Sequence, residues 1–225
     1  MHSRISAAIV DLDGTLVDTL GDFHAALAAM LQGLGLPPLT REAVARLIGK
    51  GSEHLIRSAL TQAGASPSLY ERGWDGYQQA YAGLNGRHAA VYPGVSEGLH
   101  ALHAAGWPLA CLTNKPTVFA RELLAQKGLL DAFALVFGGD AFPRKKPDPL
   151  PVLRTCEALG SAPQRTLVVG DSRNDAAAAR AAGCPVVLVT YGYNHGEPVR
   201  AVEADGYVDS LAQLPAVLRA LRGFA

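Results

Sequence analysis

The sequence predicts an α/β fold, with a doubly wound parallel sheet as its core and an inserted α-helical cap. Two observations carry the prediction of the core: short apolar runs recur along the chain, and most are separated by segments long enough for helical crossovers. Such alternation favours a parallel sheet with helices on both faces. A long stretch of helical patterns without a convincing strand indicates the insertion.

The expected core elements follow one another in a regular order. The expected strands are ISAAIV (5–10), PLACLT (108–113), ALVFGG (134–139), TLVVGD (166–171) and PVVLV (185–189). Periodic Ala/Leu/Arg-rich segments are expected to be helices at 95–106, 117–128 and 173–183. Each of these segments ends in a glycine, which adopts a left-handed helix C-cap at low cost.

The insertion is expected to be a helical cap over residues 15–88, with the core formed by residues 1–14 and 89–225. Helical patterns cover 19–35, 40–49 and 67–84, and Thr40 is a typical N-cap residue. The two connections to the core would then lie side by side at the edge of the sheet. The aromatic residues of this segment are expected to pack within the cap rather than to contact a ligand; they are Phe23, Trp74, Tyr77 and Tyr81.

Composition excludes several classes of protein. The 225 residues are 49% hydrophobic and 18% charged, with 20 basic and 20 acidic residues, which is typical of a globular chain. The balance of charge gives no basic excess for a nucleic-acid partner. No apolar run is long enough for a membrane span or a signal sequence, so no membrane partner and a cytoplasmic location are expected.

The cysteines point to a reducing compartment. Cys111, Cys156 and Cys184 lie far apart in the sequence and form no CxxC pair. They predict neither a zinc site nor a disulfide framework, and each is expected to be a small buried apolar residue.

Chemically active residues follow several of the predicted strands. In open parallel sheets ligands bind beyond the carboxyl ends of the strands, so these residues are candidates for one site. The four groups are Asp11 and Asp13, Thr113 and Asn114, Lys146, and Asp171 and Asp175. Clustered carboxylates repel one another unless a cation neutralises them, and Mg²⁺ is the simplest such cation. Together with a lysine and a hydroxyl, they predict a phosphate site.

Other interpretations of single motifs fit less well. DLDGT lacks the glycine and glutamate positions of a calcium loop, GKGS lacks those of a phosphate-binding loop, and no GxGxxG follows a strand. An isolated aspartate after a strand is more often a turn former or helix cap, and Asp175 also fits a capping role. The conjunction of four such groups, in order, favours a functional site.

These motifs resemble a known family. DLDGTLVDT, LTNK, KPDP and VGDSRND are similar, in order and spacing, to the four motifs of the haloacid-dehalogenase-like superfamily of phosphotransferases. The resemblance extends over the whole chain, and TYGYNHGEP is similar to the corresponding stretch of bacterial phosphoglycolate phosphatases. It implies a Rossmann-like core with a cap inserted after the first motif.

The resemblance also implies roles for the acidic residues. Asp11 would attack phosphorus and form an aspartyl-phosphate, and Asp13 would protonate the leaving alkoxide and then activate water. The metal ligands would be the side chains of Asp11 and Asp171 with the main-chain carbonyl of Asp13. Asp175 would support the metal shell or orient Lys146.

The phosphoryl oxygens would be held by residues of the second and third motifs. The resemblance assigns this role to the Thr113 hydroxyl, the Asn114 backbone N–H and Lys146, which is favoured over Lys145 because it directly precedes PDP. In the cap, Lys50 is expected to contact the substrate or merely to be solvated, ahead of a Schiff-base role. If it faces the site, its charge would bind the carboxylate of a small substrate. Arg46 and Arg57 are weaker candidates for helping it.

The expected function is therefore Mg²⁺-dependent hydrolysis of a small phosphorylated metabolite, with 2-phosphoglycolate the leading substrate. Asp13 argues against dehalogenase and phosphonate-hydrolase activities, because the dehalogenases and phosphonate hydrolases that resemble this fold lack an aspartate two residues after the nucleophile. A phosphatase for another small ester such as a sugar phosphate, a sugar phosphomutase and an inactive regulatory protein of the same fold are the alternatives. A monomer or homodimer is expected.

Overall fold

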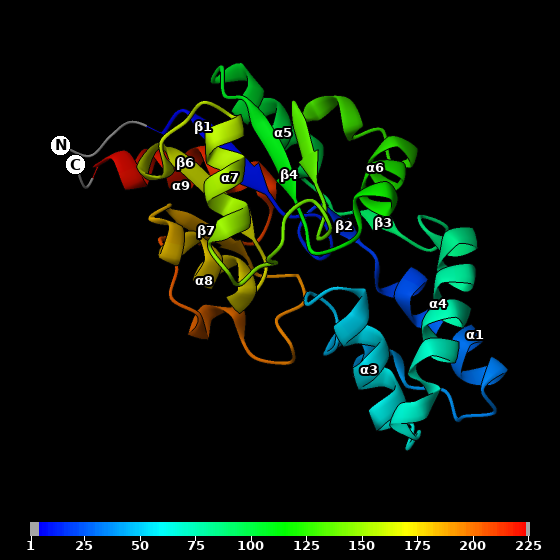
Figure 1. The fold of residues 1–225 in the computed structure, drawn as a ribbon. Helices are drawn as coiled ribbons and strands as arrows, with labels where there is room; N and C mark the ends of the chain where they lie inside the picture. The colour runs from blue at the N-terminus through cyan, green and yellow to red at the C-terminus, as the bar shows by residue number, and fades with distance from the viewer. Residues whose placement is uncertain (1–4, 224–225) are drawn as a thin grey trace.

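The core is a single parallel sheet between two layers of helices (Figure 1). The computed structural model describes residues 5–223. Its six strands run in the order β5-β4-β1-β6-β7-β8, and every neighbouring pair is parallel. The strands are β1 (Ala7–Val10), β4 (Leu109–Leu112), β5 (Leu135–Phe137), β6 (Thr166–Gly170), β7 (Val186–Val189) and β8 (Gly206–Val208). This arrangement confirms the predicted doubly wound core.

The central strands are buried on both faces, which explains their nearly continuous apolar sequences. Val10 packs with α5 (Val95–Ala104), α6 (Thr117–Gln126) and α9 (Leu214–Gly223) on one face. Its neighbour Ile9 packs on the other face, against α7 (Leu150–Ala158) and α8 (Arg173–Ala182). Successive strand residues point to opposite faces, so both layers need apolar residues from the same strand.

The predicted helices of the core are also confirmed. The expected segments contain α5, α6 and α8, and each stops within two residues of its closing glycine. Gly183 caps α8 with φ +78°, in the left-handed region that favours glycine.

The insertion is helical, but its connections to the core contain two short strands that the sequence did not predict. Its helices are α1 (Leu20–Gly33), α2 (Arg41–Ala45), α3 (Ser52–Gln62) and α4 (Tyr70–Leu84). β2 (Val17–Asp18) pairs antiparallel with β3 (Ala90–Val91) where the chain leaves and re-enters the core. Each strand is two residues long, too short to produce a recognisable pattern. The exact domain division at 14/15 and 88/89 stays a prediction.

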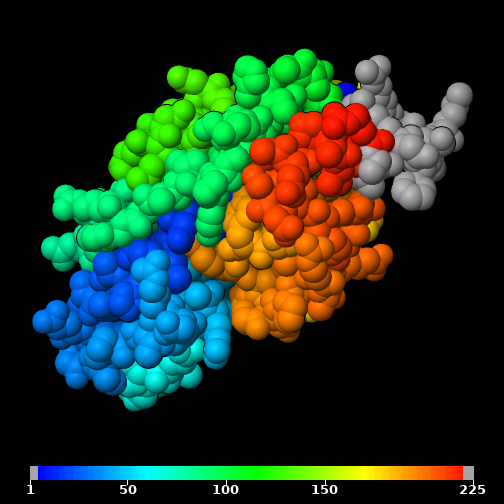
Figure 2. All heavy atoms as spheres, turned by 180° about the vertical axis from the view of Figure 1, so that it is seen from behind, coloured from blue at the N-terminus to red at the C-terminus, as the bar shows by residue number. Residues whose placement is uncertain are grey.

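Asp22 fastens the two connections to each other. It lies in the first turn of α1 with no exposed surface, and its carboxylate accepts hydrogen bonds from Gly86 N at 2.7 Å and His88 N at 2.6 Å. The outgoing and returning segments therefore lie side by side, as the sequence predicted. In the space-filling view the cap rests against one side of the core (Figure 2).

The structure places two of the three cysteines together. All three are buried free thiols, and the Sγ atoms of Cys156 and Cys184 are 3.8 Å apart. Across residues 5–223, no helix has both the length and the apolar character needed to cross a bilayer.

Candidate active site

Most of the candidate residues at the carboxyl edge of the sheet gather around one cavity. The core residues that line it are Asp11, Asp13, Thr113, Asn114, Lys115, Pro116, Lys146, Ser172 and Asp175. The cap closes it with Phe23, Ile48, Gly49, Gly51, Ser52, Leu55 and Tyr81. Asp171 does not line the cavity, but its carboxylate lies close to those of Asp11 and Asp175. The cavity therefore lies between the sheet and the cap.

Lys146 is the charged centre of the core side of this cavity. Its Nζ lies 2.8 Å from Asp11 Oδ1, 2.7 Å from Asp175 Oδ1 and 2.8 Å from the Leu112 carbonyl oxygen. Three acceptors thus match the three N–H donors of an ammonium group. Burial alone would lower the pKa of Lys146, but Asp11 and Asp175 outweigh it and raise this pKa, so the ammonium stays charged.

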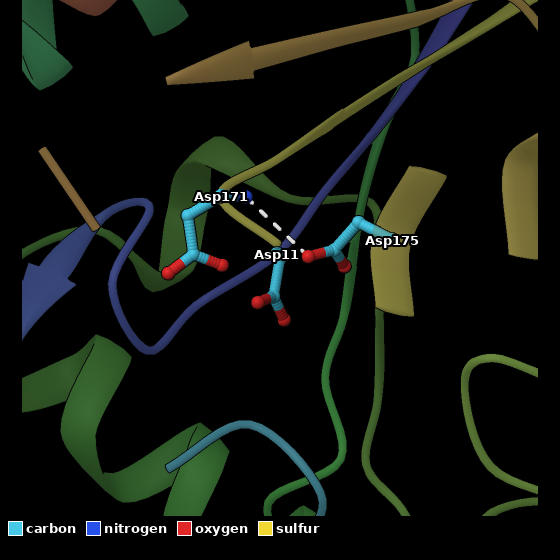
Figure 3. Close-up of side chains that lie close together, drawn as sticks. All are labelled: Asp11, Asp171 and Asp175. Atoms are coloured by element: carbon cyan, nitrogen blue, oxygen red, sulfur yellow. Dashed lines mark hydrogen bonds between the residues drawn. The ribbon is translucent and has the colours of Figure 1, made fainter. Parts of the chain in front are cut away.

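Asp11, Asp171 and Asp175 form a compact group of carboxylates (Figure 3). One oxygen from each residue lies within 4.8 Å of the other two. Burial is the main cause that raises the pKa of Asp11 to about 7; the charge of Lys146 opposes this rise, and repulsion from Asp175 adds to it. Burial and the charges of Asp175 and Asp11 also raise the pKa of Asp171 well above its usual range. The group therefore carries more negative charge than Lys146 alone neutralises.

Asp175 differs from the other two because protein donors occupy both its oxygens. Oδ1 accepts from Lys146, and Oδ2 accepts from the hydroxyl of Ser172 at 2.6 Å and from its backbone N–H at 3.2 Å, in a capping box at the start of α8. These interactions outweigh burial and lower the pKa of Asp175. The contacts support an orienting role toward Lys146; direct metal ligation by Asp175 stays a prediction.

The residues present fit a hard divalent cation. Asp11 and Asp171 offer carboxylate oxygens to a shared space, and burial, with a further contribution from neighbouring carboxylates, raises the pKa of each. Asp171 is fixed in place, because its Oδ2 accepts a hydrogen bond from Tyr193 N at 2.6 Å. A β-carbon at Gly14 would lie 2.0 Å from the same oxygen, so a glycine is required where the β1 loop passes this carboxylate.

Asp13 lies apart from the three clustered carboxylates and has a lysine of its own. Its Oδ1 is 2.8 Å from Nζ of Lys115, a side chain that is 1% exposed. The same ammonium lies 4.3 Å from the ring centre of Phe23 and 5.1 Å from that of Tyr81. Each of the two aspartates after β1 therefore has a different cationic partner.

Thr113 and Asn114 hold the second motif in a defined shape. Thr113 Oγ1 accepts a hydrogen bond from Lys115 N at 3.2 Å, so its own O–H proton is left to donate. The Asn114 side chain donates to Lys146 O at 2.9 Å and accepts from Lys146 N at 3.1 Å. Within residues 5–223, the Asn114 backbone N–H has no protein acceptor.

The cap residues predicted to contact a substrate lie elsewhere. Lys50 is exposed and does not line the cavity, although its neighbours Gly49 and Gly51 do. Arg57 pairs with Glu53 at 3.1 Å and stacks on the Tyr70 ring, and Arg46 is exposed. Contact of these residues with a substrate stays a prediction that no geometry in this conformation supports.

Two of the aromatic residues expected to serve packing alone also line the cavity. Phe23 and Tyr81 stack on each other in the cap core, with ring centres 5.4 Å apart, and both face the site. Tyr77 is fully buried beside Tyr81, and Trp74 packs at the edge of the same cluster, so these two serve the expected packing role.

Sequence reasoning assigned no role in the site to Lys115 or to the loop after β7, although both lie in stretches that carry the family resemblance. Lys115 stands directly after the Thr-Asn pair, and this adjacency was the available signal. In the loop, the Tyr193 hydroxyl accepts from Thr19 N at 3.0 Å and Leu20 N at 3.1 Å, at the start of α1. The Asn174 side chain donates to Gly49 O at 3.2 Å, so the core contacts the cap at a second point.

The comparisons with known proteins agree with this geometry. The family model described as "haloacid dehalogenase-like hydrolase" matches residues 5–183. The chain is 44% identical over 212 residues to the phosphoglycolate phosphatase of Thiobacillus denitrificans, covering 93% of each chain. It is 45% identical over 214 residues to that of Chromobacterium violaceum, covering 94% of this chain and 95% of the relative.

A solved structure extends the agreement to three dimensions. The crystal structure of a protein from Haemophilus somnus, described as a predicted phosphoglycolate phosphatase, superimposes with a TM-score of 0.91 at 33% identity. The match covers 96% of this chain and 99% of that one. The chain belongs to the haloacid dehalogenase-like hydrolase family.

Proposed function

We propose that this protein hydrolyses 2-phosphoglycolate to glycolate and inorganic phosphate through an aspartyl-phosphate on Asp11. The observation that carries the proposal is the position of Asp11. Its carboxylate lies at the carboxyl end of the central strand, lines the cavity under the cap and contacts the buried ammonium of Lys146 at 2.8 Å. A carboxylate so placed can attack phosphorus while a fixed cation balances the charge that develops on the phosphoryl oxygens.

Asp13 is the proposed acid and base of the reaction. When Asp11 attacks, the bond from phosphorus to the substrate's ester oxygen breaks, and Asp13 protonates that oxygen as it leaves. Asp13 then accepts a proton from the water that attacks the phosphoryl group and releases phosphate. Lys115, 2.8 Å from Asp13, keeps this carboxyl group beside the cavity but apart from Asp11.

Three further groups would stabilise the phosphoryl oxygens during transfer. The Thr113 hydroxyl and the Asn114 backbone N–H both have a proton available, and Lys146 adds a full positive charge. Hydrogen bonds fix the peptide of Lys146 to the Asn114 side chain, so these groups need little rearrangement in the transition state.

Asp11 and Asp171, with the main-chain carbonyl of Asp13, would hold Mg²⁺. When bound, the ion would neutralise carboxylate charge and withdraw electron density from a phosphoryl oxygen. Asp175 would keep Lys146 in place through the 2.7 Å ion pair.

The choice of 2-phosphoglycolate is supported by the names of relatives that are 44% and 45% identical over nearly the whole chain. A cytoplasmic location and a monomeric or homodimeric state complete the proposal, and three buried free thiols support a reducing compartment.

A substrate panel tests the proposal. Phosphate release is measured with and without Mg²⁺ for 2-phosphoglycolate, ethyl phosphate, p-nitrophenyl phosphate and several sugar phosphates. The proposal expects kcat/KM for 2-phosphoglycolate to exceed the others by at least about tenfold and activity to require the metal. Equal or faster turnover of a sugar phosphate would refute the proposed substrate.

A further inference from the structure

The two buried lysines of the cavity differ in how many of their donors are occupied. Lys146 has three acceptor oxygens within 2.8 Å. For Lys115, the part of the chain that the structure describes provides one, Asp13 Oδ1 at 2.8 Å. Two of its three N–H donors are therefore without an oxygen partner. A buried ammonium with so few acceptors is costly to desolvate unless a further anion or polar group completes its shell.

Aromatic rings from the cap limit the directions from which an anion can approach the Lys115 ammonium. The Lys115 ammonium lies over the Phe23 ring at 4.3 Å and the Tyr81 ring at 5.1 Å, which belong to α1 and α4. These ring faces stabilise the charge but accept no strong hydrogen bond. The open direction is the cavity, because all three of these residues line it.

Tyr81 lines the same cavity and carries a second unpartnered polar group. Its side chain is 1% exposed, and its hydroxyl has no hydrogen-bond partner among the described residues. Buried hydroxyls are nearly always hydrogen-bonded, so an orphan at a ligand cavity points to a missing polar partner. Lys115 and Tyr81 thus reach the cavity from opposite sides of the interface between core and cap.

The position of Asp13 indicates which part of the substrate would lie near Lys115 and Tyr81. Under the proposed function, Asp13 reaches the ester oxygen of the substrate, and Lys115 contacts Asp13 on the side where Phe23 and Tyr81 close the cavity. The part of the substrate beyond its ester oxygen would therefore lie next to Lys115. In a phosphorylated 2-hydroxy acid, that part carries a carboxylate one carbon atom from the ester oxygen.

We propose that Lys115 is the specificity-determining residue that binds the substrate carboxylate, with Tyr81 as its neighbour in the cap. This inference rests on the proposed function and deepens it. The free N–H donors of Lys115 hydrogen-bond to the carboxylate while the remaining donor keeps its contact with Asp13. A phosphomonoester without a carboxylate leaves those donors unpaired and binds more weakly. The exposed Lys50 is not required for this contact.

A specificity ratio tests the inference. The ratio divides kcat/KM for 2-phosphoglycolate by kcat/KM for ethyl phosphate, which lacks the carboxylate. Lys115→Met should lower this ratio about 10- to 100-fold, the value of a hydrogen bond to a charged group. Any damage through Asp13 affects both substrates and cancels in the ratio. Lys145→Met is the matched control, because Lys145 is an exposed lysine that directly precedes Lys146 in the sequence. It should leave the ratio unchanged.

Outcomes that overturn the inference are equally defined. An unchanged ratio in Lys115→Met, whether or not both rates fall, would mean that Lys115 acts only through Asp13. If Lys115→Met does not fold, Lys115→Gln is measured in the same way. Independently of any variant, the wild-type protein should bind 3-phosphonopropionate at least about tenfold more tightly than propylphosphonate, which lacks the carboxylate. Equal affinity would overturn the inference.

The design also separates this inference from the proposed function. If the wild-type enzyme prefers another carboxylate-bearing ester, such as 3-phosphoglycerate, and Lys115→Met removes that preference, the assigned substrate is wrong but the role of Lys115 stands. If 2-phosphoglycolate is preferred and Lys115→Met keeps the preference, the proposed function stands and the role of Lys115 fails.

Discussion

The side-chain amide of Asn114 donates a hydrogen bond to the carbonyl oxygen of Gly49 at 2.9 Å, and this contact joins the second motif of the core to the cap. The same side chain holds the peptide of Lys146 through two further hydrogen bonds. One residue therefore couples the position of the cap to the position of the lysine that faces the phosphoryl site.

We expect Asn114→Ala to weaken both the protein and the reaction. Three hydrogen bonds are lost, which should lower the free energy of unfolding by about 2–3 kcal/mol, and kcat should fall because the peptide of Lys146 is no longer held. Urea denaturation and steady-state kinetics measure the two effects.

Asn174→Ala is the matched control for Asn114→Ala. It removes the other hydrogen bond to Gly49, at 3.2 Å, and leaves Lys146 untouched. It should cost about 1 kcal/mol of stability and change kcat less than Asn114→Ala does. Equal losses of kcat in the two variants would contradict a coupling through Lys146.

Tyr193→Phe should destabilise the junction between core and cap. The Tyr193 hydroxyl accepts from the backbone N–H groups of Thr19 and Leu20 and donates to Asp18, all at the start of α1. Without the hydroxyl, a buried N–H and a carboxylate lose a hydrogen-bond partner. The free energy of unfolding should therefore fall by about 1–3 kcal/mol. Tyr191→Phe, which removes one hydrogen bond to Thr15 O, should cost less. A smaller loss for Tyr193→Phe would refute this account of the junction.

Stability should depend on pH in a way that Mg²⁺ reverses. Burial raises the pKa of Asp11 from 3.8 to about 7, against the charge of Lys146 and with a further contribution from the charge of Asp175. Between these values the folded metal-free protein keeps a proton that the unfolded chain has released. The free energy of unfolding therefore falls as pH rises from about 4 to about 7, by roughly 4 kcal/mol. Asp171, whose pKa is also raised, acts in the same direction.

Thermal denaturation at pH 5 and pH 8, with and without Mg²⁺, measures this dependence. We expect the metal-free protein to melt at lower temperature at pH 8, and Mg²⁺ to restore stability mainly there, because binding requires deprotonated carboxylates. Asp11→Asn should remove much of the pH dependence. Greater metal-free stability at pH 8 than at pH 5 would contradict the raised pKa values.

The core strands and their strand-end residues could be predicted because their signals are local. Asp11, Thr113 and Asp171 each follow a short apolar run, and parallel strands bring their carboxyl ends to one edge. The sixth strand, β8, was missed because its sequence GYV is too short to show periodicity. β2 and β3, at two residues each, were missed for the same reason.

The cap side of the site could not be predicted because it depends on how helices distant in sequence pack. Lys115 becomes a buried cation only when Phe23 of α1 and Tyr81 of α4 cover it. Lys50 was the sequence candidate because glycines flank it, but the loop turns its side chain to solvent and presents the backbone at Gly49 to the site. Helical periodicity identifies a buried face without identifying its partner.

The central claim is that Asp11 carries the phosphoryl group, and chemical trapping tests it most directly. The wild-type protein with Mg²⁺ is mixed with 2-phosphoglycolate, quenched within milliseconds in acid and reduced with borohydride, which converts an aspartyl-phosphate to homoserine. Peptide mass spectrometry should then find homoserine at position 11, and Asp11→Asn should give none. Homoserine at position 13 would contradict the account. So would the absence of homoserine at position 11 under conditions of rapid turnover.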